Sequence, residues 1–231
     1  MDETIAQAMN ILWRGPASPT RGPKPKLTHG MIARAGIALA DTEGLSAVSM
    51  QRISESLGVT KMALYRYVPS KIVLLALMTD EAMHMPHGID LDPNDWRASL
   101  TRWAHGLADL LMQHGWVLEV TQGPRPVGPT ETLWLDRALA CLEHARLDGQ
   151  ARISTVAAIA GMVRGVVQQQ LAAPSGGEES SHFIEAIRDA ARRGRKYPAL
   201  AAAISERSGV RRQALDHGLD LIFDGLERHM G

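Results

Sequence analysis

The residues best suited to chemistry on a phosphate lie together in one short segment. Residues 59–71 read V-T-K-M-A-L-Y-R-Y-V-P-S-K, and they hold two of the three tyrosines in a chain of 231 residues. Three Lys or Arg stand beside them. A tyrosine hydroxyl on a rigid side chain is a good donor to a phosphate oxygen, and a nearby cation adds to the attraction. The segment is therefore a candidate for contact with nucleic acid.

The charge of the chain is unevenly distributed, although its formal net charge is zero. From Arg14 to Lys71 there are nine Lys or Arg against three Asp or Glu, and the balance is reversed over the rest of the chain. A neutral total can hide such an asymmetry, and a local excess of positive charge favours a polyanion. The positive charge is gathered in the N-terminal quarter.

Three short helices joined by tight turns are expected around the candidate segment. Ser, Thr and Gly stand where caps and stops are needed: Thr28, Ser49, Thr60 and Ser70 can cap helices, and Gly44 and Gly58 can end them. The expected helices are 28–43, 50–57 and 61–67, followed by a longer one from Lys71. This order of elements predicts a helix-turn-helix.

The second helix of this motif lies in the DNA major groove with its first turn at the base edges. In this chain the first turn holds Lys61, Met62 and Ala63, and Leu64 faces inward with Val68. This arrangement leaves Tyr65 and Tyr67 facing the duplex or its flanks.

Two motifs stand in the N-terminal part of the chain: I-A-L-A-D-T-E-G-L at 37–45 and G-V-T-x-x-x-L-Y-x-Y-V-x-S-K at 58–71. Through them the segment 28–83 resembles the DNA-binding domain of the TetR (tetracycline-repressor-like) family of bacterial transcription regulators. Weaker resemblance to the ligand-binding domain of the tetracycline repressor branch lies in D-W-R at 95–97, R-P-x-G-P at 125–129 and the closing G-L-D-L-I-F-D-G-L-E.

The resemblance implies specific roles at operator DNA, the double-stranded partner of such regulators. Base contacts are implied for Gln51, Lys61, Met62 and Ala63, and phosphate contacts for Ser49, Thr60, Tyr65, Tyr67 and Lys71. Met62 departs from the small residue common at its position, and its thioether suits a thymine methyl but forms no strong base hydrogen bond. The sequence does not place Arg66, for which a backbone contact and a solvated surface position are equally compatible.

Three parts are predicted: a flexible basic Pro-rich arm (1–26), the helix-turn-helix domain (27–71) and a larger helical domain for ligand binding and dimerisation (72–231). The arm segment R-G-P-K-P-K could follow the minor groove, and it is equally compatible with a solvated tail. Beyond Pro86 the expected helices are 95–114, 116–122, 130–145, 152–172, 182–195, 198–208 and 211–230. The fold class is all-α.

Two of these helices carry a broad apolar stripe. Such stripes normally form intramolecular core, but the family resemblance implies a homodimer in which the two helices pair with their copies as a four-helix bundle. The residues expected at this interface are Val156, Ile159, Val163, Val167, Leu215, Leu219, Ile222 and Phe223.

A pocket for a small hydrophobic or amphipathic effector is expected where aromatics gather. Four of the five tryptophans lie between Trp96 and Trp134, and a ligand pocket is lined by apolar groups with a few polar ones. The residues expected to line it are Trp103, His105, Leu107, Met112, Trp134, Met162 and Val166. For any one of them, an ordinary core position is the simpler interpretation.

Other chemistry has weaker support. His84 and His87 flank Pro86, which ends a helix, and no Cys or nearby carboxylate completes a metal site, so an exposed helix end is the preferred interpretation. The single Cys141 cannot form an internal disulfide, and no run of about 18 apolar residues suggests a membrane span. We therefore expect no metal, no cofactor, no membrane partner and a cytoplasmic location.

The pattern predicts a ligand-responsive DNA-binding regulator, a homodimeric repressor released from its operator by its effector. An activator or global regulator of the same fold is an open alternative, as is a helical interaction module without an effector. An enzyme is disfavoured because no G-x-S-x-G elbow or phosphate-binding glycine loop is found.

Overall fold

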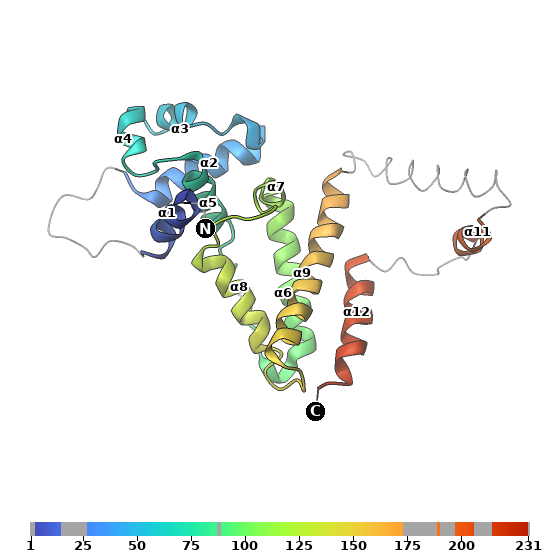
Figure 1. Cartoon of the computed structure of the whole chain (residues 1–231). Helices are drawn as coiled ribbons and strands as arrows, with labels where there is room; N and C mark the ends of the chain where they lie inside the picture. Colours follow the sequence, from blue (N-terminus) through green and yellow to red (C-terminus); the bar gives the residue numbers. More distant parts are fainter. Residues whose placement is uncertain are drawn as a thin grey trace.

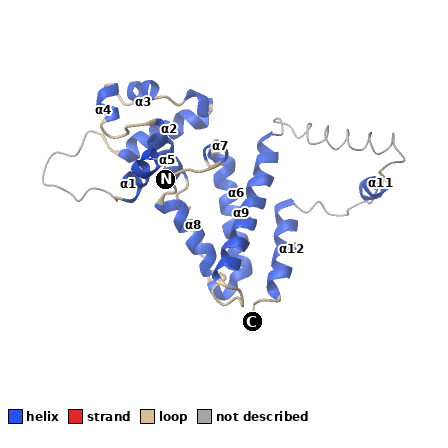
Figure 2. Cartoon of the chain, viewed as in Figure 1, coloured by secondary structure: helices blue, strands red, loops and turns tan. Residues whose placement is uncertain are grey.

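The computed structural model describes residues 3–14, 27–86, 89–172, 189, 197–205 and 214–230, and they form a helical molecule (Figures 1 and 2). Within these ranges no strand forms, and the one isolated bridge joins Ala145 to Met230. The predicted all-α class is confirmed. The helices are α1 (Glu3–Trp13), α2 (His29–Glu43), η1 (Leu45–Ala47), α3 (Met50–Ser56), α4 (Lys61–Tyr65), α5 (Lys71–Ala82), η2 (Pro93–Asp95), α6 (Trp96–Gln113), α7 (Val117–Val120), α8 (Pro129–Ala140), α9 (Gly149–Ala172), α11 (Pro198–Ser205) and α12 (Ala214–Glu227).

The N-terminal helices begin where the sequence predicts because each has a side-chain cap. The hydroxyl oxygens of Thr28, Ser49, Thr60 and Ser70 accept hydrogen bonds from the backbone N–H three residues later, at 3.2–3.3 Å. These bonds satisfy donors that have no partner within the helix. Gly44 and Gly58 follow α2 and α3 with φ of 83° and 62°, values that a side chain would make costly. The predicted starts of α2 to α5 are confirmed.

The N-terminal helices are held together by a core beneath α3 and α4. Helix α2 packs on α5, and α3 packs on α4. Leu64 and Val68 are completely buried, as is Ile53 of α3, so the predicted inward face of α4 is correct. Figure 1 shows α3 and α4 at the end of the molecule away from the C-terminus.

Helix α1 corrects the prediction of a flexible arm over residues 1–26. It packs on α5 and buries Ala8 and Leu12, which lie four residues apart on one face. Its far end contacts the loop before α8, where the Trp13 indole donates to the Val127 carbonyl at 3.1 Å. The apolar face of α1 is stabilised by tertiary contact with α5. The prediction missed this helix because the Pro-rich segment after it indicated a flexible arm. Residues 15–26 lie outside the described residues, and their contact with DNA stays a prediction.

The larger domain is a bundle in which α9 packs against α6, α8 and α12 (Figure 1). Its helices differ from the predicted ranges mainly at their ends. Helix α7 has only four residues, and α8 ends at Ala140 in a series of turns. Apart from Asp189, the expected helix 182–195 lies outside the described residues.

The stripes predicted for a dimer interface are instead core of the single chain. Val156, Ile159, Val163 and Val167 of α9 are at most 2% exposed, and Leu215, Leu219 and Phe223 of α12 are at most 5% exposed. Ile222 is partly buried against the same core. Because α6, α9 and α12 pack on one another, the seven fully buried side chains are not available to a second copy, and for them the ordinary interpretation of such stripes as core holds. The homodimer itself stays a prediction.

No helix in the described part of the chain combines the length and the apolar character needed to cross a bilayer.

Candidate DNA-reading surface and effector pocket

The first turn of α4 presents its side chains to solvent. Lys61 is exposed and Met62 is 76% exposed, while Ala63 is half-buried. Tyr65 is 43% exposed on the same short helix. An apolar methionine left so open on a rigid helix has a surface available to a base edge or thymine methyl. The structure therefore brings together three of the residues expected to read bases.

The other residues expected to contact DNA surround this helix, and some of their side chains are held by hydrogen bonds within the protein. Gln51 is exposed on α3, but its amide donates to Glu55 one turn later. Ser49 and Thr60 already cap their helices, so their hydroxyls can still donate but not move far. Lys71 is exposed at the first residue of α5.

Tyr67 and Arg66 lie on the flank of the reading helix beside α1. The Tyr67 ring stands edge-on to the His29 ring, and the two centroids are 6.1 Å apart. The backbone carbonyl oxygen of Tyr67 lies 3.1 Å from His29 Nε2. Arg66, which the sequence could not place, borders a polar groove of about 760 Å³ that also includes Arg14 of the α1 end. The flank therefore adds cations to the reading surface.

An apolar cavity of about 350 Å³ lies in the larger domain, next to the end of α5. Its size falls within the range of small-molecule pockets. Its other walls come from α6, α8 and α9, from the α7 segment and from the loop before α8. The lining residues are Met83, Trp103, Leu107, Leu111, Val117, Thr121, Val127, Glu131, Thr132, Trp134, Leu135, Val156, Ala157, Ala160 and Arg164.

Three of the seven residues predicted for the pocket line this cavity, namely Trp103, Leu107 and Trp134. The other four lie outside it. His105 Nε2 is 2.8 Å from Asp216 of α12, which makes it a link between helices. Met112 is 42% exposed, Val166 is partly buried on α9 outside the lining, and the Met162 sulfur sits against Gly218 of α12. The difference arises because helical spacing alone does not show which neighbour each face meets.

The two pocket tryptophans are fixed by hydrogen bonds to carbonyl oxygens. Trp103 Nε1 donates to the Trp134 carbonyl at 2.8 Å, and Trp134 Nε1 donates to the Met83 carbonyl at 2.7 Å. Their ring centroids are 5.9 Å apart with an edge-on tilt of 68°. Both indoles are nearly fully buried. They therefore offer a ligand fixed aromatic walls and no spare N–H.

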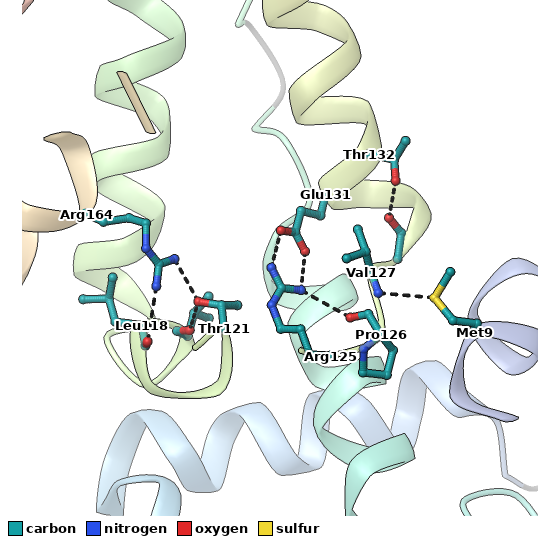
Figure 3. Close-up of polar contacts among 11 residues, drawn as sticks. Met9, Leu118, Thr121, Arg125, Pro126, Val127, Glu131, Thr132 and Arg164 are labelled. Atoms are coloured by element: carbon teal, nitrogen blue, oxygen red, sulfur yellow. Dashed lines mark hydrogen bonds and ion pairs between the residues drawn. The ribbon is translucent and has the colours of Figure 1, made fainter. Parts of the chain in front are cut away.

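One end of the cavity is polar (Figure 3). Arg125 forms a paired contact with both Glu131 carboxylate oxygens, one at 2.6 Å. Arg164 of α9 donates to the Thr121 hydroxyl at 2.8 Å and to the Leu118 carbonyl at 3.3 Å. Burial, and secondarily the charge of Arg125, lowers the pKa of Arg164 from its usual value. No sequence signal pointed to Arg164, because it stands within the apolar stretch 156–167 of α9 without any motif around it.

A polar cluster on the partly exposed side chain of Asp41 joins the pocket wall to the N-terminal helices. Asp41 near the end of α2 accepts a hydrogen bond from Trp116 Nε1 at 2.7 Å, and His114 Nδ1 lies 2.9 and 3.0 Å from its two oxygens. His114 and Trp116 are at most 9% exposed, and the next residue, Val117, lines the cavity. We call Asp41, His114 and Trp116 the interdomain clasp. No sequence signal predicted it, since Asp41 and Trp116 are 75 positions apart.

A second connection ties α5 to the start of α8. Asp80 Oδ1 accepts from the Thr130 N–H at 2.9 Å, and desolvation raises the pKa of this carboxyl. An added Cβ at Gly128 would collide with the Asp80 carboxylate, which explains a glycine in the R-P-x-G-P loop. The segments that line the pocket are thus connected to α2 through Asp41 and to α5 through Asp80.

The histidine pair before α6 is only partly described. His84 Nδ1 lies 2.9 Å from the Glu81 carbonyl at the end of α5, whereas His87 lies outside the described residues. Among those that are described, no three His, Cys, Asp or Glu side chains gather in a way that could hold a metal ion.

Family models match most of the chain. Residues 32–78 match the bacterial regulatory proteins of the tetR family, and residues 90–230 match the tetracyclin repressor-like C-terminal domain. The second match alone covers more than half of the sequence.

Curated relatives and solved structures agree with these models. The HTH-type transcriptional repressor DrrR1 of Streptomyces coeruleorubidus is 32% identical, over 96% of this chain and 86% of that protein. The tetracycline repressor protein class A from transposon 1721 of Escherichia coli is 26% identical, over 88% and 92%. The fold resembles that of ActR from Streptomyces coelicolor, solved with actinorhodin, at a TM-score of 0.74 and 21% identity, covering 90% of this chain and 99% of that one.

Proposed function

The chain belongs to the TetR family of bacterial transcription regulators, and from this we propose that it acts as a homodimeric repressor that an effector releases from operator DNA. The effector would occupy the cavity among α6, α8 and α9. The role is one of binding and release without catalysis. Its relative DrrR1 is named as a transcriptional repressor, which supports the direction of regulation.

The DNA-reading role is supported by the open surface of α4. Lys61, Met62 and Tyr65 are exposed, whereas Leu64 behind them is fully buried. A recognition helix needs this division because its inner face fixes the orientation of the outer one. Lys71 at the start of α5 and Arg66 on the flank would add phosphate contacts.

The observation that carries the proposal is the position of the interdomain clasp. Val117 and Thr121 line the cavity, while His114 and Trp116 immediately before them hold Asp41 of α2. A ligand that displaces the α7 segment therefore acts on the residues that position the DNA-binding domain. On the other side of the cavity, Asp80 connects α5 to α8.

For such a route to regulate DNA binding, the effector must favour one arrangement of the two domains. A ligand with equal affinity for both arrangements would shift nothing. Release of DNA would follow if the effector-bound position of α7 holds α2 and α5 where the two reading helices of a dimer no longer match adjacent turns of the groove.

The dimer we propose uses the outward faces of α9 and α12, not their buried stripes. Leu221 of α12 is 63% exposed, and Cβ atoms added at Gly161, Gly165 and Gly225 would meet nothing within 4 Å. Glycine inside a helix costs about 1 kcal/mol relative to alanine, and packing within the described chain gives no reason for these three. Close approach of the same helices from a second copy would supply one.

The proposal is tested by titrating a fluorescent duplex of the chain's own upstream DNA at several salt concentrations. We expect the logarithm of the binding constant to fall linearly with the logarithm of salt. Lys71→Ala should weaken binding and lower the slope by about one, because one phosphate would no longer be neutralised by the protein. Arg137→Ala, an exposed cation on α8 away from the reading surface, is the matched control. Binding that lacks salt dependence, or equal weakening in both variants, would contradict the proposal.

A further inference from the structure

The polar end of the cavity holds more positive than negative charge. Glu131 and Arg125 engage each other through both carboxylate oxygens, so their charges compensate. Arg164 remains, and its hydrogen bonds go to two neutral oxygens, those of Thr121 and Leu118 (Figure 3). Within the described part of the chain, no carboxylate forms an ion pair with it.

Asp80, the carboxyl group on the α5 side of the cavity, has its own partner. It accepts the Thr130 N–H at the start of α8, and within the described residues it forms no ion pair with Arg164. Burial is the main cause that lowers the pKa of Arg164, and the like charge of Arg125 adds to it. The attraction of the Glu131 carboxylate acts in the opposite direction and is smaller. An arginine keeps its proton at neutral pH in any case. The cavity end therefore carries one guanidinium charge without a paired anion.

Arg164 is half-buried at the edge of an apolar cavity, and an anion that enters the cavity would pair with its charge. The less water reaches a charge, the more it is stabilised by such a partner. A guanidinium has five N–H donors, and the two bonds to Thr121 and Leu118 leave donors free. These donors suit an anionic oxygen group, such as a carboxylate or a sulfonate, whose oxygens can accept two parallel hydrogen bonds.

The rest of the cavity fixes the body of the ligand. Both tryptophan N–H groups are used within the protein, and the Thr132 hydroxyl donates to the Gly128 carbonyl at 2.9 Å. Leu107, Leu111 and Val156 complete the apolar walls. Beyond the Arg164 end, the lining offers aromatic and aliphatic contact and few free donors.

We propose that the effector is an aromatic acid: an apolar ring system against Trp103 and Trp134 with an anionic oxygen group paired to Arg164. This inference rests on the proposed function, since it concerns the chemical class of the effector at the same pocket. A carboxylate, a sulfonate or an ionised phenol would each satisfy the guanidinium. A neutral ring of the same size would leave Arg164 unpaired.

The test compares two fluorescent probes with the same aromatic skeleton. Anilinonaphthalene sulfonate carries an anion, and N-phenylnaphthylamine is its neutral counterpart without the sulfonate. We expect the wild-type chain to bind the sulfonate at least about tenfold more tightly, a difference of about 1.4 kcal/mol. Arg164→Met should remove most of this preference while changing the affinity of the neutral probe little. Arg164→Lys should retain part of it, because the charge remains.

Two controls locate the effect. Ala160→Trp fills the cavity from α9, and the affinity for both probes should then fall together. Arg137→Met removes an exposed cation that does not line the cavity and should change neither affinity. Equal affinity for the two probes in the wild type, an undiminished preference in Arg164→Met, or binding that survives Ala160→Trp would overturn the inference.

The outcome is separable from the regulator proposal. The DNA titration contains no probe, so its failure would reject operator binding without touching the anion preference. Absence of that preference, with DNA binding and release intact, would reject only the acidic effector.

Discussion

Helix α4 and helix α9 both have an inner and an outer face, but the two divisions come about differently. In α4 the inner residue Leu64 is buried and the outer Met62 is open, as predicted from the Thr60 cap, although the helix ends at Tyr65 and not at the predicted Tyr67. In α9 the longest apolar stripe, from Val156 to Val167, faces the chain's own α6 and α12. The outward face has instead small residues and glycines.

The contrast shows which features of a helix its local sequence pattern can predict. A short helix between two caps has one direction of burial, because the helix before it is only a turn away. A long helix surrounded by three others has several apolar sides, and only the packing decides which side meets which neighbour. Three variant pairs test this contrast.

The largest expected effect is at the inner face of α4. Leu64→Ala removes a fully buried side chain and should lower the free energy of unfolding by about 2–5 kcal/mol, with loss of DNA binding. Met62→Ala, on the open face, should change stability by less than about 0.5 kcal/mol while altering DNA affinity. Urea denaturation followed by DNA titration measures both. A stability loss of similar size in the two variants would show that α4 has no such division.

The next effect concerns the interdomain clasp. Asp41→Ala leaves the Trp116 N–H and His114 without their acceptor, and should cost about 1–3 kcal/mol. The same change should weaken the release of DNA by an effector more than it weakens binding of the effector itself.

Arg34→Ala is the matched control for the clasp. It breaks an exposed ion pair to Glu81, also between α2 and a neighbouring helix, and should cost at most about 1 kcal/mol. Parallel denaturation and probe-release titrations compare the two. If both variants leave the release of DNA unchanged, the clasp is not the route between the domains.

The smallest expected effect on the folded chain comes from the outward face of α12. Leu221→Glu should leave the stability of the single chain nearly unchanged, because the side chain is 63% exposed, and should weaken the dimer by about tenfold or more. Leu133→Glu on α8, 41% exposed, places the same charge on a face outside the proposed bundle. Analytical ultracentrifugation over a concentration range reports the assembly. Dissociation by Leu133→Glu, with no change from Leu221→Glu, would place the interface on another face.

More of the DNA-binding domain than of the pocket could be predicted from the sequence, because local pattern specifies the first and packing between distant helices specifies the second. Caps, stops and the buried Leu64 depend on neighbours within a few residues, so their positions are confirmed. Trp103, Leu107 and Trp134 line the cavity, and they could be predicted because aromatic and apolar residues generally line ligand pockets. His105 and Met162 turned toward α12 instead, since contact across the bundle decided their direction.

Sequence alone determined the helical class, the helix-turn-helix, the starts of its helices and the family resemblance, because each rests on local spacing and capping. Tertiary structure decided that α1 joins the core, that the stripes of α9 and α12 are internal, and that Arg164 faces a cavity without a paired anion in the described part of the chain. It also decided that Asp41 meets His114 and Trp116. These contacts join residues far apart in the chain, and no local pattern encodes which of many possible partners a side chain will meet.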